Sequence, residues 1–437
     1  MRLVVVILMS CFFIACSNSG RKQFSARIDN NNQFSILQGS TDSTSTIIRL
    51  TYPKFFDLKY TITDEKKNSV PVSHVKHYEK ENNEFRVTHL FIDNLSPQKQ
   101  YELSVQAQGV KWSDKRLFRT LPKNKEQLRI LVASCMSDTY NEIGNEIWPK
   151  AFAHDPDIVF LTGDNLYADV YSGVYIGKQI EMTPIHLWNR HVDHAMKMKI
   201  YRMKKLKPTL VTWDDHDYGV NDGDKSYKFK HVSKNIFHIF FPTKENAWLS
   251  KGPGVGHSFR YMKTNFLFLD ARSFRDSKTN KDGYHFGKKQ REWITKQMKN
   301  DKLKMNWLIS GDQFYGGYHK FESFEGLHPK EFLNFRKDLA KLGEKSLFLS
   351  GDRHLVEVMK IKDDVLGEDT LEYTVSGVHT KMYPGSLDYS PNSRRVDGFD
   401  GKPNYAIFDI TTKKDDFLVN FKAYSLTGKE VDRKDKF

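Results

Sequence analysis

Cysteine is scarce in this chain, and its leading apolar run is short. Only three cysteines occur in 437 residues, and two of them, Cys11 and Cys16, lie within the first sixteen. The rest of the chain holds a single thiol, Cys135, which excludes a framework of internal disulfides. The apolar stretch Leu3–Ala15 is too short to cross a bilayer as a helix, which takes about 20 residues. The isolated Cys135 is either a functional thiol or a small buried apolar side chain.

The first residues resemble a bacterial export signal. One arginine precedes the apolar stretch and small residues follow it, which is typical of a secretory signal peptide. The ending Phe13–Cys16 resembles a lipobox, whose cysteine is lipidated and becomes the mature N-terminus. We expect residues 1–15 to be the signal peptide and 16–33 a tether, lipid-anchored through Cys16 in the bacterial cell envelope. Ser17 favours the outer membrane, facing periplasm or surface, whereas the alternative is an ordinary signal with an incidental cysteine.

The composition is that of a basic globular protein. Aromatic residues make up 13% of the chain, the formal net charge is +14 and the isoelectric point is about 9.3. This charge favours anionic partners such as phosphate groups, nucleic acid or an anionic envelope surface. The positive charges are dispersed, and runs such as Lys204–Lys207 are typical of solvated helix faces. Nucleic-acid binding is therefore the weaker of these expectations.

The segment 34–122 has the pattern of a small all-β domain. Apolar and polar residues alternate over short stretches that turn-rich segments separate, as in a β-sandwich. The expected strands are SILQGS, STIIRLTYP, FFDLKYTIT, EFRVTHLFI, QYELSVQAQ and RLFRTLP. Leu95–Pro97 with Tyr101 and Val105, and the ending Phe118–Pro122, resemble a fibronectin type III-like module. No polar cluster there points to chemistry, so we expect a supporting or spacing role.

From residue 128 onward the pattern changes to longer units. Apolar runs alternate with amphipathic stretches, which predicts layered α/β structure. Six runs end on cysteine or aspartate, namely RILVASC, DIVFLTGD, TLVTWDD, NFLFLD, MNWLISGD and SLFLSGD. Because open α/β sheets bind ligands at the carboxyl ends of their strands, six such endings indicate one shared site. The expected helices are Asn145–His154, Ile185–Lys205, Lys288–Asn300 and Pro329–Leu342.

Three of these endings carry candidate metal-binding side chains. The segments are Gly163–Tyr167, Trp213–Asp217 and Ser350–His354, which together supply carboxylates, histidines and a phenol. Crowded carboxylates repel one another, so a shared site would need cations to keep them ionised. The alternative for any single segment is turn and capping chemistry, in which aspartate and glycine are common. For the set, a metal site is the better interpretation.

The ordered motifs resemble the alkaline phosphatase D (PhoD-like) family of metallophosphoesterases. The resemblance covers roughly Leu128 to His379, and six motifs in this order are highly specific. They are Ser134-Cys135, Gly163-Asp164-x-x-Tyr167, Trp213-Asp214-Asp215-His216, Leu269-Asp270-x-Arg272-x-x-Arg275, Phe286-Gly287-x-x-Gln290-x-x-Trp293 and Ser350-Gly351-Asp352-x-His354. The family's usual Asp-Asp-His-Glu reads Asp-Asp-His-Asp here, a conservative change.

The resemblance implies a fold and a set of metals. The fold class is α/β (α+β), with a metallophosphoesterase-like two-sheet sandwich flanked by helices over 128–437, preceded by the small all-β sandwich domain. Iron(III) would be held by anionic and imidazole donors from Cys135, Asp164, Tyr167 and His354. A second site, suited to calcium or another divalent metal, would share the first aspartate. Its donors would be Asp164, Asp215 and Asp352. In this interpretation Cys135 is a ligand, and a buried structural thiol is the alternative.

Other motif residues would act on the substrate or support the ligands. His216 is expected to stabilise the transition state or protonate the leaving group, oriented by Asp217. The alternatives for His216 are a metal ligand and a structural hydrogen-bond donor. Arg353 and Arg272 are candidate phosphate-binding residues. The alternative for Arg353 is an outward salt bridge, and the alternative for Arg272 is a structural pairing with Asp270. Two residues are expected to orient ligands rather than bind metal: Asp214 and Asn221.

These expectations describe an exported, lipid-anchored phosphatase. It would hydrolyse phosphate mono- or diesters by attack of a metal-activated hydroxide or oxygen. We expect a monomer whose partners are a phosphate ester and, through the lipid on Cys16, a membrane. Two alternatives stay open: a nuclease or phospholipase-type phosphodiesterase of the same chemistry, and a non-catalytic surface-binding lipoprotein. Retention of every proposed ligand argues against the last.

Overall fold

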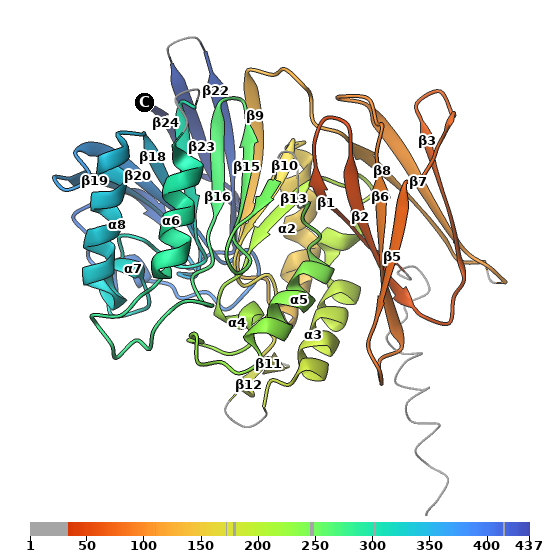
Figure 1. The fold of residues 1–437 in the computed structure, drawn as a ribbon, viewed down its shortest axis with the longest axis horizontal. Coiled ribbons are helices and arrows are strands. Elements are labelled where there is room, and N and C mark those ends of the chain that lie inside the picture. Colours follow the sequence, from red (N-terminus) through yellow and green to blue (C-terminus); the bar gives the residue numbers. More distant parts are fainter. Residues whose placement is uncertain are drawn as a thin grey trace, which may run out of the picture.

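The protein consists of an all-β unit followed by two larger sheets flanked by helices (Figure 1). This computed structural model describes residues 34–109, 111–171, 173–177, 181–244, 249–299, 303–413 and 416–437. The predicted signal peptide, the tether and Cys16 lie outside the described residues. Within these ranges no helix is long and apolar enough to cross a membrane. The predicted fold class is confirmed.

The N-terminal β-sandwich is built from two antiparallel four-stranded sheets, with the orders β1-β2-β6-β5 and β4-β3-β7-β8. Its strands are β1 (Ser35–Thr41), β2 (Thr46–Pro53), β3 (Leu58–Asp64), β4 (Ser69–Val70), β5 (His74–Glu79), β6 (Phe85–Ile92), β7 (Gln100–Ala107) and β8 (Ser113–Arg119). Apolar side chains of both sheets, such as Ile48, Leu90 and Leu103, form its core. All six predicted strands are present, and β4 and β5 are additional.

The second part of the chain contains a six-stranded and an eight-stranded sheet. Their orders are β13-β10-β9-β22-β23-β24 and β14-β15-β16-β17-β18-β20-β19-β21. The first contains β9 (Gln127–Ala133), β10 (Ile158–Thr162), β13 (Thr209–Thr212), β22 (Asn404–Thr412), β23 (Phe417–Ser425) and β24 (Gly428–Lys436). The second contains β14 (Leu249–Lys251), β15 (His257–Tyr261), β16 (Thr264–Phe268), β17 (Met305–Ile309), β18 (Ser346–Ser350), β19 (Val356–Asp363), β20 (Glu368–Val375) and β21 (Arg395–Phe399). A separate hairpin joins β11 (Val170–Tyr171) to β12 (Val174–Tyr175).

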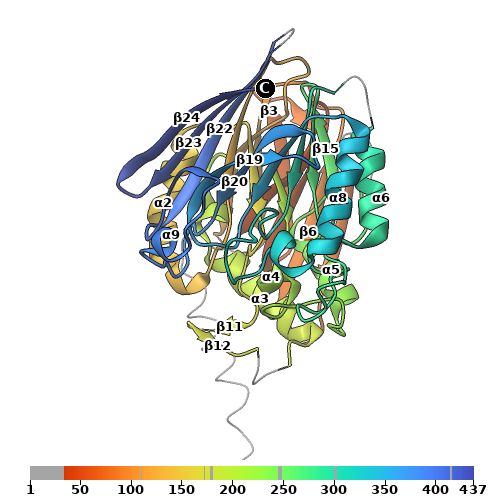
Figure 2. The ribbon, with the colours of Figure 1, turned by 90° about the vertical axis from the view of Figure 1, so that its left-hand side faces the viewer.

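One core lies between the two large sheets, and helices cover their outer faces. Phe160, Phe266 and Phe408 belong to this shared core. Helices α2, α3 and α5 pack on the six-stranded sheet, whereas α6, α7 and α8 pack on the eight-stranded sheet, so α2 and α6 lie on opposite sides (Figure 2). The helices are α2 (Asn141–Ala153), α3 (Pro184–Lys197), α4 (Asp215–Tyr218), α5 (Lys230–Phe240), α6 (Gly287–Met298), α7 (Phe324–Leu327), α8 (Pro329–Leu342) and α9 (Ser386–Tyr389), with 3-10 turns η1 (Asp138–Tyr140) and η2 (Lys199–Arg202).

The parallel strands bring all six predicted strand endings to the same edges. Strands β9, β10 and β13 run parallel in one sheet, and β16, β17 and β18 run parallel in the other. Each of the six is short and apolar and is followed within two or three residues by its cysteine or aspartate. Four of the six endings, those with Cys135, Asp164, Asp214 and Asp352, supply side chains to one site. The other two aspartates pair elsewhere, Asp270 with Trp213 and Asp312 with His285.

The β-sandwich is docked firmly on the helical side of the six-stranded sheet. Strands β1 and β2 are buried along their whole length. The guanidinium of Arg49 on β2 donates to the carbonyl of Phe240 at 2.9 Å and lies 4.7 Å from the ring centroid of Tyr201. The backbone N–H of Ser40 donates to the carbonyl of Pro242 at 3.0 Å. These contacts make the sandwich a fixed support for α5 rather than a loose spacer.

Candidate metal centre

The six-stranded and the eight-stranded sheet approach each other so closely at their carboxyl edges that certain positions there must be glycine. A Cβ atom on Gly351, after β18, would lie 2.4 Å from the carbonyl oxygen of Thr162 on β10. Gly163, after β10, has a φ of 93°, and a Cβ there would lie 3.0 Å from the Cα of Gly311, which follows β17 in the other sheet. Only glycine fits such an approach without moving the backbone. The Gly-Asp pairs read from the sequence are therefore the contact points between the carboxyl edges of the two sheets.

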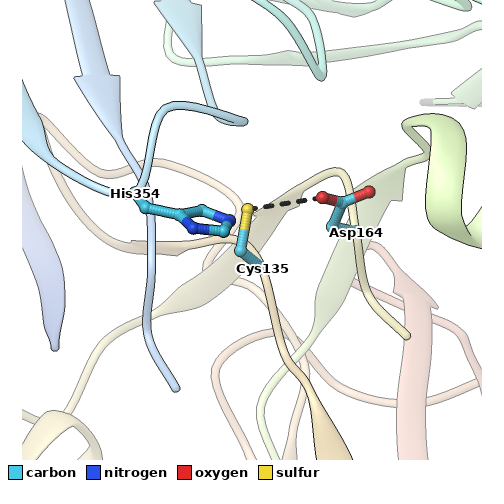
Figure 3. Close-up of side chains that lie close together, drawn as sticks. All are labelled: Cys135, Asp164 and His354. Carbon is cyan, nitrogen blue, oxygen red and sulfur yellow. Dashed lines mark hydrogen bonds between the residues drawn. The ribbon is translucent and has the colours of Figure 1, made fainter. Parts of the chain in front are cut away.

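The first group of candidate ligands joins both sheets. Figure 3 shows the Cys135 thiol between the His354 imidazole and the Asp164 carboxylate. The ligand atoms of these three residues lie within 4.8 Å of one another, and Cys135 Sγ is 3.6 Å from Asp164 Oδ2. The Tyr167 hydroxyl lies 3.1 Å from His354 Nε2. The structure thus brings together the four residues predicted to hold iron(III).

The second group extends from the same aspartate. Asp164 lies within 4.8 Å of the ligand atoms of Asp215 and His216, and also within that distance of Asp214 and Asp352. Asp215 and Asp352, the other predicted residues of the divalent site, therefore each lie near Asp164, but in two separate groups. The bridging role of Asp164 stays a prediction. Sequence reasoning missed a third acidic group at the same edge. Its members are Asp215, Asp222 and Glu322.

Four predicted ligands adopt a backbone conformation that side chains normally avoid. The φ angles are 60° at Cys135, 50° at Asp164, 64° at Asp352 and 53° at His354. Aspartate and histidine tolerate this left-handed region better than most residues, but a buried cysteine does not. Each such residue costs roughly 1–3 kcal/mol and persists where surrounding structure holds it. Their convergence on one point is typical of a functional site.

The electrostatics of the group fit bound cations. Burial, with smaller contributions from Cys135 and Asp215, raises the pKa of Asp164 well above its ordinary value. Burial and the Asp215 carboxylate raise the pKa of Asp352 to about 7. Burial raises the pKa of the Cys135 thiol to about 12. Anions crowded in a buried place need positive charge to stay ionised, and these thiol, phenol, imidazole and carboxyl donors suit metal ions.

Asp169, and not Asp217, orients His216. Nδ1 of His216 lies 2.6 Å from Oδ1 of Asp169, and the ring lies against Tyr167 with centroids 4.1 Å apart. Burial lowers the pKa of His216, but Asp215 and Asp169 outweigh it and hold that pKa well above its ordinary value. The prediction for Asp217 is wrong, because its carboxylate accepts hydrogen bonds from the backbone of Asp214 and from Asn165 at the start of α4.

The prediction that Arg272 binds phosphate is also wrong. Its guanidinium is fully buried and donates from Nε to Asp214 at 2.6 Å and from Nη1 to Glu322 at 2.7 Å. The pairing is structural, as the alternative held, but the guanidinium uses these two carboxylates. Arg272 donates to Asp270 only through its backbone N–H. Arg272 thereby holds Asp214 beside the candidate ligands, and Asp214 itself belongs to a candidate metal group with Asp164 and Asp352. Its orienting role stays a prediction.

Of the two remaining predicted residues, Arg353 is buried and Asn221 is exposed. Arg353 is 8% exposed, its guanidinium carbon lies 4.3 Å from the centroid of the Phe321 ring, and no ion pair joins it to an acid of the described residues. Its role in binding phosphate stays a prediction. Asn221 is exposed, and its backbone N–H donates to Oδ2 of Asp169 at 2.7 Å. Its support of the site therefore runs through the backbone and Asp169.

Comparisons with known proteins agree with this geometry. A model of the family described as PhoD-like phosphatase matches residues 130–401, well over half of the chain. Alkaline phosphatase D of Bacillus subtilis (strain 168) is 23% identical over 263 residues, which are 52% of this chain and 44% of that protein. The chain thus spans less than half the length of this curated relative. The solved structure of PhoD matches with a TM-score of 0.70 and 16% identity, covering 93% of each chain, which confirms the fold. The chain belongs to the PhoD-like phosphatase family.

Proposed function

We propose that this protein is a metal-dependent hydrolase of phosphate mono- or diesters. The observation that carries the proposal is the convergence of Cys135, Asp164 and His354 with a second set of carboxylates at the meeting edges of two sheets. Membership of a family of phosphatases supports the same reaction class. A screen of monoester, diester, phospholipid and nucleic-acid substrates, with metal analysis, tests the proposal. No turnover of any of them by the metal-loaded protein would favour the non-catalytic alternative.

The ligands divide by donor type between two proposed metals. Iron(III) would be held by Cys135, Asp164, Tyr167 and His354. Calcium or another divalent ion would be held by Asp164, Asp215 and Asp352. When bound, these cations would supply Lewis-acid chemistry and an activated nucleophile at neutral pH. Ser376 supports the thiolate, since its hydroxyl lies 3.2 Å from Cys135 Sγ.

Residues of the chain would bind the phosphate and move the proton. Arg353 stands between two candidate ligands and has no carboxylate partner in the described part of the chain, so its guanidinium suits a phosphate oxygen. His216, with Nδ1 held by Asp169, would use Nε2 to donate a proton to the leaving alkoxide. The contact of the imidazole with the Tyr167 ring limits its rotation. Protonation makes the alkoxide a better leaving group.

Replacing Cys135 with serine is expected to lower iron content and change the visible absorption of the purified protein. A hydroxyl is a far poorer anionic ligand than a thiolate at neutral pH, and thiolate and phenolate ligands to iron(III) give charge-transfer bands. The measurement is an absorption spectrum with metal analysis. Serine is close in size, so the fold should survive, which circular dichroism would check. A thiol that reacts freely in the metal-loaded protein, with iron unchanged by serine, would make Cys135 a core residue.

We further propose that the protein is exported and lipid-anchored in the bacterial cell envelope through Cys16, in the outer membrane. The support is the sequence of residues 1–17 alone. Cys16→Ala should leave the protein unprocessed or move it out of the membrane fraction, as fractionation and N-terminal sequencing would show. A soluble wild type that begins at another residue contradicts this. We also propose a monomeric state, which light scattering on the purified protein would test.

A further inference from the structure

Two exposed aromatic side chains stand beside the candidate metal centre. Phe321 is 49% exposed and its ring lies 4.3 Å from the guanidinium carbon of Arg353. Tyr383 is 48% exposed and stacks on the imidazole of His354, with centroids 5.6 Å apart and 11° between the planes. Phe321 and Tyr383 form an aromatic pair at this edge of the site. Exposed rings of this size are costly to leave in water and often mark a binding surface.

Each residue of the aromatic pair is directly connected to a candidate ligand, Phe321 as its neighbour in the sequence and Tyr383 by ring stacking. Glu322, the residue after Phe321, points inward and lies within 4.8 Å of the ligand atoms of Asp215 and Asp222. His354, on which Tyr383 stacks, lies within the same distance of Cys135 and Asp164. The two rings therefore flank the residues proposed to hold metal and phosphate. The organic part of an ester held there would lie within reach of them.

Positive charges accompany both rings. The ammonium of Lys320 lies 5.7 Å from the Phe321 ring centroid, and that of Lys381 lies 5.3 Å from the Tyr383 ring centroid. With Arg353 they make a surface of flat rings interleaved with cations. Such surfaces bind nucleotides, because a ring stacks on the base while cations meet the phosphates. An acyl chain can also cover an apolar ring, but only a flat base adds the stacking of two ring systems to that burial.

We propose that the aromatic pair binds the base of a nucleotide substrate, so that the preferred esters are nucleoside phosphates. This inference rests on the proposed hydrolase function. Hydrolysis would break the bond between phosphorus and the sugar oxygen, with water adding to phosphorus and a proton passing to the sugar alkoxide. The base takes no part in that chemistry. Its stacking would raise kcat/KM through the affinity of the ester.

The test compares AMP with ribose 5-phosphate, which share the phosphate and the leaving alkoxide and differ in the base. We expect the wild-type kcat/KM for AMP to exceed that for ribose 5-phosphate about tenfold or more, the effect of one stacked base. Phe321→Leu and Tyr383→Leu keep apolar bulk without a flat face, so the ratio should fall towards one. Metal content and thermal unfolding would be measured for each. Phe55→Leu, at a 61% exposed position of the β-sandwich, is the control and should keep the ratio.

Each other outcome has a distinct meaning. A wild-type ratio near one, or a ratio that both leucine variants preserve, overturns the inference and leaves the hydrolase proposal standing. If neither ester is hydrolysed, calorimetry decides: tighter binding of AMP than of ribose 5-phosphate, lost in the leucine variants, supports the inference, and equal binding overturns it. A wild-type preference for vesicles of phosphatidic acid over AMP would also overturn the inference.

Discussion

Replacing Asp164 with asparagine is expected to lower kcat by at least about 10³-fold and to release metal from both proposed sites. Asp164 belongs to three of the candidate metal groups in the described residues, more than any other residue there. Asparagine keeps the size but loses the charge that two cations would share. Metal assistance is worth several kcal/mol, and each 1.36 kcal/mol is a factor of ten. Metal analysis and steady-state kinetics on the purified variant measure both effects.

Asp409→Asn provides the matched control. This aspartate lies on β22 in the same sheet, and Arg129 contacts it at 2.6 Å in a partly exposed pair. Exposed pairs of this kind contribute little to stability, so the variant should fold and keep both its metals and its turnover. Full metal content and near-normal turnover in Asp164→Asn would show that the groups around it do not form a shared metal site.

His216→Ala is expected to lower turnover by about 10²–10⁴-fold while both metals stay bound. This is the usual contribution of a positioned general acid. The metals should remain because the proposed ligands are other residues, and Nε2 of His216, with Nδ1 on Asp169, is the nitrogen proposed to donate the proton. Single-turnover kinetics with substrates of different leaving-group pKa should show the largest loss for the poorest leaving group. Metal analysis of the same sample completes the measurement.

His231→Ala removes an exposed histidine on α5 and should behave as wild type. Asp169→Asn should reproduce part of the His216 loss, since asparagine keeps a contact but cannot stabilise the charged imidazole. Loss of metal from His216→Ala would make the histidine a ligand. Near-normal turnover would remove it from the mechanism altogether.

The elements that could be predicted from the sequence are those whose apolar residues recur with a regular strand or helix period, because that face packs in the core. The apolar runs before Cys135, Asp164 and Asp352 are strands β9, β10 and β18, and Pro329–Leu342 is a helix with those limits. Strand β5 was not predicted, because its residues are largely exposed and polar, so burial imposes no apolar pattern on it. Helix α3 ends at Lys197, not at the predicted Lys205, because Met198 turns extended with no glycine or proline to mark the end.

The grouping of the candidate ligands was predictable from the sequence, whereas the residues that support them were not. The end of a buried strand is recognisable in the sequence, because an apolar run is followed by a polar residue. A hydrogen-bond partner is not, because it depends on the direction of a side chain. Asp217 is next to His216 in sequence, but one turn of α4 directs it to Asn165. Asp169 lies 47 positions earlier and still reaches the imidazole. The only signal for it was its place in the loop after Asp164, five residues on.

The close meeting of the two sheets has a consequence for how the protein matures. Cys135 and Asp164 follow strands of one sheet, whereas Asp352 and His354 follow a strand of the other. Tyr167 and His354, 187 positions apart, must also come together. The proposed ligand set is complete only once the two halves of the chain have closed, so metal uptake would be a late event of folding. Once taken up, the ions would act as cross-links that make the halves unfold together.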